Sequence, residues 1–94
     1  MTTTTQHRAT AAWQQVASGP GSATVIRTTT APVLVHVGEE TPAPGQAGAP
    51  LAGTRELISF GGLPEGTGVF VRAADGPSDV VVIAAEQEVV VALG

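Results

Sequence analysis

The side chains that could carry chemistry in this 94-residue chain are few and far apart. The two histidines are His7, near the N-terminus, and His36, within an apolar stretch, and neither cysteine nor lysine is present. No serine stands in a Gly-x-Ser-x-Gly turn, and no glycine-rich phosphate loop occurs. Because nucleophilic and acid–base catalysis need such groups close together, the sequence predicts a non-enzymatic protein without catalytic residues.

Two acidic groupings resemble metal sites only superficially. His36 lies close in sequence to Glu39 and Glu40, but this spacing matches no known ligand pattern. Asp75 and Asp79 flank a Gly-Pro turn, and the spacing of a calcium loop is missing. We therefore expect neither metal nor cofactor, and we interpret the two aspartates as turn formers.

Charge and hydropathy exclude two classes of partner. The four arginines are dispersed along the chain, and the net charge is −4. A nucleic-acid binder needs a basic face with several phosphate contacts, so we expect no nucleic-acid partner. The apolar runs are far shorter than the ~20 residues that span a bilayer. The N-terminus has no basic region leading into an apolar segment, which predicts no signal peptide and no membrane partner.

The valine-rich stretch 68–93 dominates the chain. It contains three apolar runs, at 69–72, 80–84 and 89–93, separated by turn residues at 74–78 and a polar break at 86–88. Valine and isoleucine favour the pleated, half-buried surface of a sheet. These runs predict three consecutive antiparallel strands.

Four further runs, at 9–16, 23–29, 32–37 and 54–60, also read as strands, and we expect the second and third to form a hairpin across residues 29–31. The spacing of the runs predicts an all-β fold, a small antiparallel β-sandwich or barrel of about seven short strands. Trp13, in the first run, is expected to be a packing residue.

The chain is expected to hold one domain over residues 9–94, preceded by a flexible or partner-bound N-terminal arm at 1–8. A long Pro/Gly loop at 39–53 interrupts the domain, and loops of this length are usually functional or disordered. The arm and the loop are candidate contacts with a larger partner, by strand addition or by docking of the prolines. The candidate contact residues are Thr3, Thr4, Thr5, Arg8, Pro42, Pro44 and Pro50.

The last two apolar runs are apolar on both faces, whereas a strand of a two-layer sandwich normally alternates. A domain of this size has one core, so the second face would be an exposed apolar patch unless other subunits, or a tightly closed barrel, cover it. This predicts a homo-oligomer, most simply a trimer. The interface residues that follow from it are Val80, Val81, Val82, Ile83, Val89, Val90, Val91 and Leu93.

The order of these parts resembles small virion proteins of tailed bacteriophages, of the head-decoration and spike type. The segments that carry the resemblance are the early tryptophan strand, the paired runs ATVIRTT and PVLVHV, the loop ending in APLAG, and the strand GTGVFVRA. The resemblance implies a non-enzymatic β-rich subunit, commonly trimeric, that is bound to the major capsid protein or another virion protein. It implies a virion location after synthesis in the host cytoplasm, and a role as a capsid decoration or cement protein.

A different class of function stays open. A small β-sandwich could bind a protein or carbohydrate ligand as part of a cellular or tail-associated protein. Such modules usually present exposed aromatic side chains as contact anchors. This chain has only three aromatic residues, Trp13, Phe60 and Phe70.

Overall fold

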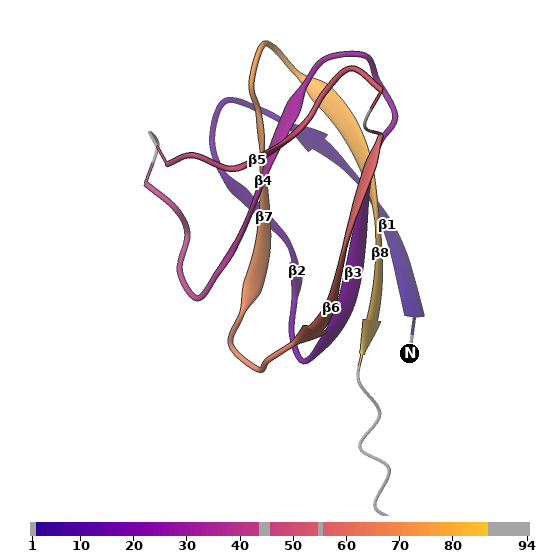
Figure 1. Cartoon of the computed structure of the whole chain (residues 1–94), viewed down its shortest axis with the longest axis vertical. Coiled ribbons are helices and arrows are strands. Elements are labelled where there is room, and N and C mark those ends of the chain that lie inside the picture. Colours follow the sequence, from indigo (N-terminus) through magenta and orange to yellow (C-terminus); the bar gives the residue numbers. More distant parts are fainter. Residues whose placement is uncertain (1, 44–45, 55, 87–94) are drawn as a thin grey trace, which may run out of the picture.

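The computed structural model describes residues 2–43, 46–54 and 56–86, which fold into two four-stranded sheets packed face to face (Figure 1). All strand pairs are antiparallel. Within these residues there is no helix that could cross a membrane. The strands are β1 (Thr2–Ala9), β2 (Gln14–Ser18), β3 (Gly21–Arg27), β4 (Val33–Gly38), β5 (Ala49–Leu51), β6 (Leu57–Leu63), β7 (Gly68–Ala73) and β8 (Ser78–Glu86).

The predicted antiparallel β-sandwich is confirmed, with eight described strands rather than about seven. Sheet A has the order β1-β8-β3-β6, and sheet B has the order β2-β7-β4-β5. The first strand pairs with the last, the second with the seventh, the third with the sixth and the fourth with the fifth. The chain is therefore one long hairpin rolled into two layers, which is the jelly-roll arrangement.

The core lies between the two sheets and is built mainly from valine. In β3 the buried positions alternate strictly with more exposed ones, so Ala23 and Val25 face the other sheet while Thr24 and Ile26 face outward. Each fully buried valine contributes roughly 1.5–3 kcal/mol relative to exposure. The buried cluster consists of Ala9, Ala23, Val25, Val33, Val35, Leu51, Leu63, Val69, Val71, Ala73, Val80 and Val82.

The turn between β2 and β3 packs tightly against the turn between β6 and β7. The Gly19 N–H donates to the Thr67 carbonyl oxygen at 2.7 Å. A Cβ atom at Gly19 would lie 2.1 Å from the carbonyl oxygen of Pro64, so only glycine fits this approach. The contact ties the two sheets together at one end of the sandwich.

The predicted hairpin between residues 23–29 and 32–37 is wrong. Strand β3 belongs to sheet A and β4 to sheet B, so the chain crosses from one layer to the other between them. Thr28 holds this crossing in place, because its backbone N–H and its hydroxyl both donate to the Asp79 carbonyl oxygen, at 2.9 and 3.0 Å. The turn that we expected to join two paired strands is a crossover instead.

The final stretch also differs from three consecutive paired strands. Strand β7 lies in sheet B and β8 in sheet A, and β8 pairs with β1 and β3. The third predicted strand, at 89–93, lies outside the described residues. The reason for the difference is the rolled topology, in which long-range pairing replaces the local hairpin.

The structure replaces the expected N-terminal arm with a strand. Residues 2–9 pair with β8 in an unbroken register from Thr2 opposite Ala85 to Ala9 opposite Ser78. Threonine is β-branched and suits a sheet, and β8 offers a long free edge for it. The arm at 1–8 and the domain that follows are therefore not separate over the described residues.

Candidate functional site

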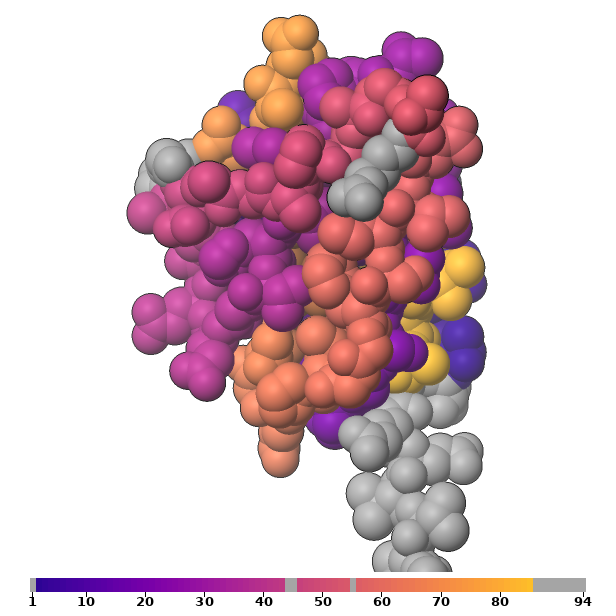
Figure 2. Space-filling view, in the orientation of Figure 1, coloured from indigo at the N-terminus to yellow at the C-terminus, as the bar shows by residue number. Residues whose placement is uncertain are grey.

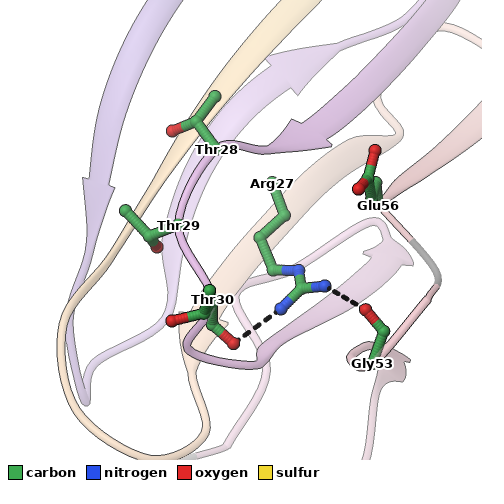
Figure 3. Close-up of a pocket in the computed structure, with 6 residues that line it drawn as sticks. All are labelled: Arg27, Thr28, Thr29, Thr30, Gly53 and Glu56. Carbon is green, nitrogen blue, oxygen red and sulfur yellow. Dashed lines mark hydrogen bonds between the residues drawn. The ribbon is translucent and has the colours of Figure 1, made fainter.

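A cavity of about 350 Å³ opens at the end of the sandwich where the chain crosses between the sheets. Arg27, at the end of β3, projects into it, and the other lining residues come from the β3–β4 and β5–β6 connections (Figure 3). They are Thr28, Thr29, Thr30, Gly53 and Glu56. The lining provides one cation, one carboxylate and three hydroxyls, groups of the kind that bind small polar molecules, and several of them are already used within the protein.

The Arg27 guanidinium links two loops within this cavity. The side chain is 8% exposed, and its terminal nitrogens donate to the carbonyl oxygens of Thr30, at 2.7 Å, and Gly53, at 2.8 Å (Figure 3). Hydrogen bonds from a charged donor are stronger than neutral ones. Arg27 therefore ties two crossover loops together, and Glu56 stands apart from the guanidinium in Figure 3.

The hydroxyls of Thr28 and Thr29 have structural partners as well. The Thr29 hydroxyl forms a hydrogen bond with the Ser78 hydroxyl and accepts the Asp79 backbone N–H at 3.1 Å. The Thr28 hydroxyl, as described above, donates to a carbonyl oxygen. These polar groups of the cavity hold the loops of the sandwich together.

A second group of side chains lies on the outer face of sheet B. Phe70 is only 2% exposed although it points away from the inter-sheet core, and the His36 ring, which also contacts Trp13, lies beside it. The His36 ring centroid is 5.9 Å from that of Trp13 and 6.3 Å from that of Phe70, and the Arg72 guanidinium lies 5.9 Å from the Trp13 ring centroid. These contacts form a small satellite core outside the sandwich.

The connection between β4 and β5 closes over this satellite core. The Trp13 indole N–H donates to the Ala43 carbonyl oxygen at 3.1 Å. Gly48 passes so close that a Cβ there would lie 3.0 Å from the Trp13 ring. Figure 2 shows this connection, in magenta and pink, on the side of the molecule away from β1 and β8. The only tryptophan of the chain is thus engaged within the molecule.

The outer face of sheet A is different, because large apolar side chains lie open on it. The register places Leu57, Ile26 and Val81 side by side across β6, β3 and β8, with Ile83 in the next row. Leu57 is 53% exposed and Ile83 is 37% exposed, while the other two are half-buried. We call these four residues the apolar stripe.

The side chains directly opposite the apolar stripe across the strands are polar and uncharged. Thr4 lies opposite Ile83, Gln6 opposite Val81, and the hydroxyls of Thr24 and Ser59 bond to each other at 2.9 Å. The next row of this face beyond Val81 holds the ion pair of Arg8 and Asp79, whose Nε and Oδ1 are 3.2 Å apart. The apolar stripe therefore has polar neighbours within its own rows and a charged pair at one end.

The predicted interface residues divide between two faces of β8. Val80 and Val82 are fully buried between the sheets, so they are core residues and their prediction as interface is wrong. Val81 and Ile83 point outward in the apolar stripe. Val89, Val90, Val91 and Leu93 lie outside the described residues. Apolarity on both faces of β8 therefore has two causes, the core on one side and the stripe on the other.

The predicted partner-contact residues lie at two separate places. Thr3, Thr4, Thr5 and Arg8 are exposed along β1, at the edge of sheet A. Pro42 is half-buried and Pro50 is exposed in β5, at the edge of sheet B, while Pro44 lies outside the described residues. The first set lies at the β1 edge of sheet A and the second lies at or near the β5 edge of sheet B, so the two sets do not form one site.

The histidines and acidic residues considered in the sequence lie in different places. In the described part of the chain no three His, Cys, Asp or Glu side chains are clustered to hold a metal ion. His7 forms hydrogen bonds with Thr5, at 2.9 Å, and Gln14, at 3.3 Å, whereas His36 is in the satellite core.

Sequence reasoning missed Arg27, Ile26 and Leu57. The signal for Arg27 was its place in an alternating run, at a position in phase with the buried Ala23 and Val25. For Leu57 and Ile26 the signal was apolarity on both faces of their strands, which was noted only for the C-terminal runs.

No family model matches this chain, and no curated protein or solved structure matches it significantly.

Proposed function

We propose that this protein is a non-enzymatic structural subunit of a virion, a decoration or cement protein of a tailed bacteriophage, that self-associates through the outer face of sheet A. The observation that carries the proposal is the apolar stripe. It lies on the outer face of one sheet of a small domain, where solvent exposure of Leu57 and Ile83 is unfavourable. A second copy that covers the stripe removes this cost.

The fold gives this proposal a supporting analogy. Jelly rolls of eight strands are the architecture of many viral capsid domains, and also of lectins and cupins. Because a fold hosts many functions, this likeness is an analogy and the stripe carries the argument. Together with the order of segments that resembles decoration proteins, it favours a virion subunit, with a trimer as the proposed state and a capsid protein as the proposed partner.

The two sheets then have different roles. Sheet A meets other copies. The side of sheet B that carries Pro42, in the β4–β5 connection, and Pro50, in β5, faces the particle. Proline limits the freedom of the unbound chain and lowers the entropy lost on docking. The net charge of −4 favours a partner surface that is neutral or basic.

The alternative, a ligand-binding module, is less well supported by the aromatic residues. Trp13 packs against His36 and its indole N–H is bound by Ala43 within the molecule. Phe70 is buried. The side chains that usually anchor a carbohydrate or peptide are therefore part of the satellite core rather than presented to a ligand.

The virion proposal is tested with particles. Phage particles purified on a density gradient should contain this chain at a fixed copy number per particle, as measured by quantitative mass spectrometry. Recombinant protein added to particles that lack it should bind with a saturable occupancy. The double variant Leu57→Thr/Ile83→Thr should bind more weakly, because a monomer loses the multivalent gain of an oligomer. Particles that neither contain the chain nor bind it would contradict the proposal.

A further inference from the structure

The four edge strands of the sandwich are not equally protected. An unpaired strand edge is a template for another chain, and proteins blunt such edges with short strands, prolines, charges or bulges. Strand β5 has three residues and includes Pro50. Strand β2 has a register shift between Gln15 and Ala17. Strand β6 has Gly62 at a φ of 64° and pairs with β3 across another register shift.

Strand β1 lacks the short length, the proline and the register shifts of the other three edges. It is eight residues long, its register with β8 is unbroken, and its sequence TTTTQHRA has no proline, glycine or lysine. Every side chain from Thr2 to Gln6 is exposed. Its one arginine, Arg8, is held by Asp79 at 3.2 Å. The hydrogen bond between His7 and Gln14 bridges from β1 to β2 at the side of the sandwich, and it involves side chains only.

We propose that β1 pairs antiparallel with β1 of a second copy of this chain. The run Thr2–Thr5 presents the same β-branched side chain at four successive positions, so two copies match each other in several registers. Threonine pairs across antiparallel strands are favourable. The edge is also nearly neutral, because Arg8 is neutralised by Asp79, so two copies meet there without like charges opposed.

The geometry fixes where the symmetry axis must lie. Directly opposed residues of an antiparallel pair point to the same face of the sheet. A two-fold axis perpendicular to sheet A therefore passes between the two copies of one residue. The axes that pair at least five residues of β1 and also oppose threonine to threonine pass through Thr4, which pairs residues 2–6, or Thr5, which pairs residues 2–8. The result is a continuous eight-stranded sheet with both apolar stripes on the same side.

This contact does not rest on the virion proposal and adds to contact through the stripe. An edge pair of one short strand is smaller than a standard interface of ~800 Å² per partner. It is consequently a weak contact that forms at high local concentration, such as on a surface covered with copies. It is isologous, which means that the same patch serves both subunits.

The absence of cysteine from the sequence makes disulfide trapping a clean test. Thr4→Cys, Thr5→Cys, Gln15→Cys and Ser59→Cys variants of the full chain are oxidised at high protein concentration, and covalent dimer is followed on denaturing gels. Gln15→Cys is the matched control on a blunted edge, and Ser59→Cys reports contact through the outer face. Disulfides need Cα atoms roughly 4.4–6.8 Å apart, so either Thr4→Cys or Thr5→Cys should cross-link at least about tenfold faster than Gln15→Cys.

Each outcome separates the edge contact from the proposed function. Fast cross-linking at position 4 or 5 supports the edge pair whether or not Ser59→Cys cross-links, and slow cross-linking at Ser59 bears only on contact through the outer face. Equal rates at positions 4, 5 and 15 would overturn the edge pair. A further experiment mixes the Thr4→Cys and Val91→Cys variants. If a disulfide between these two variants forms faster than the dimers of Thr4→Cys and of Thr5→Cys, the edge pair is also overturned, because the C-terminal segment would then occupy the edge.

Discussion

Trp13 is held by contacts on several sides rather than by deep burial. Its ring meets the edge of His36 and the guanidinium of Arg72, and its N–H binds Ala43. The side chain is only half-buried. The expectation of a packing residue therefore holds in a particular sense, because Trp13 packs the satellite core outside sheet B and not the core between the sheets.

For this reason the Trp13→Ala variant should lose less stability than a fully buried tryptophan would. We expect the free energy of unfolding to fall by about 1–3 kcal/mol, against roughly 3–5 kcal/mol for full burial. The measurement is urea unfolding followed by far-ultraviolet circular dichroism, because the variant has no other tryptophan. Trp13→Phe keeps a ring but loses the N–H, and should lie between the two. An unchanged urea midpoint for Trp13→Ala would show that the satellite core adds nothing to stability.

Arg27 links two of the connections between strands, so it affects how several structural elements are held together. It joins the carbonyl oxygen of Thr30, between β3 and β4, to that of Gly53, between β5 and β6. Its removal leaves both carbonyl groups without this donor at a largely buried position. The two crossovers that roll the hairpin into layers are thereby weakened together.

We predict that Arg27→Gln lowers the free energy of unfolding by about 2–4 kcal/mol, since each bond from a charged donor contributes roughly 1.5–3 kcal/mol. Arg8→Gln is the matched control, because Arg8 is also paired but is 71% exposed, and it should change stability by less than about 1 kcal/mol. Chemical denaturation of both variants checks this. If Arg8→Gln loses as much free energy of unfolding as Arg27→Gln, Arg27 has no special role in linking the two crossover loops.

The strand content could be predicted from the sequence, but the pairing could not. The β-branched residues of the runs 69–72 and 80–84 predict strands, and both runs lie in strands of the structure. The short turn between them, with Gly76 at a φ of 93°, looks like a hairpin turn, yet it connects two sheets. Turn chemistry fixes a local change of direction, whereas the sheet that receives the next strand depends on contacts far away in sequence.

Strand β1 was missed because polarity hid its β propensity. Threonine favours strands, but Thr2–Gln6 is exposed at an edge, so the sequence shows no apolar alternation there. The exposed face of the stripe was recovered only in part, through Val81 and Ile83. Leu57 and Ile26 become its neighbours through the β3–β6 and β3–β8 pairings, and those pairings were not predictable from local pattern.

At the scale of the whole molecule, three apolar regions have three distinct roles. The core between the sheets holds the fold, the satellite core covers sheet B, and none of the described residues covers the apolar stripe on sheet A. In a 94-residue domain without disulfides, the small hydrophobic core supplies only limited stability. Oligomerisation through the stripe would add buried apolar area without a change of fold.

Multi-angle light scattering coupled to gel filtration tests the central claim, self-association through the apolar stripe, most directly. At micromolar concentration the wild-type protein should have a mass that is a multiple of the 9.4 kDa of one chain. For the proposed trimer the mass should be three times that of one chain. Leu57→Thr/Ile83→Thr, which places a β-branched side chain suited to a strand at both positions, should elute at the mass of one chain. Leu34→Thr, on the outer face of sheet B, should keep the wild-type mass. A monomeric wild-type protein, or a double variant with unchanged mass, would contradict the account.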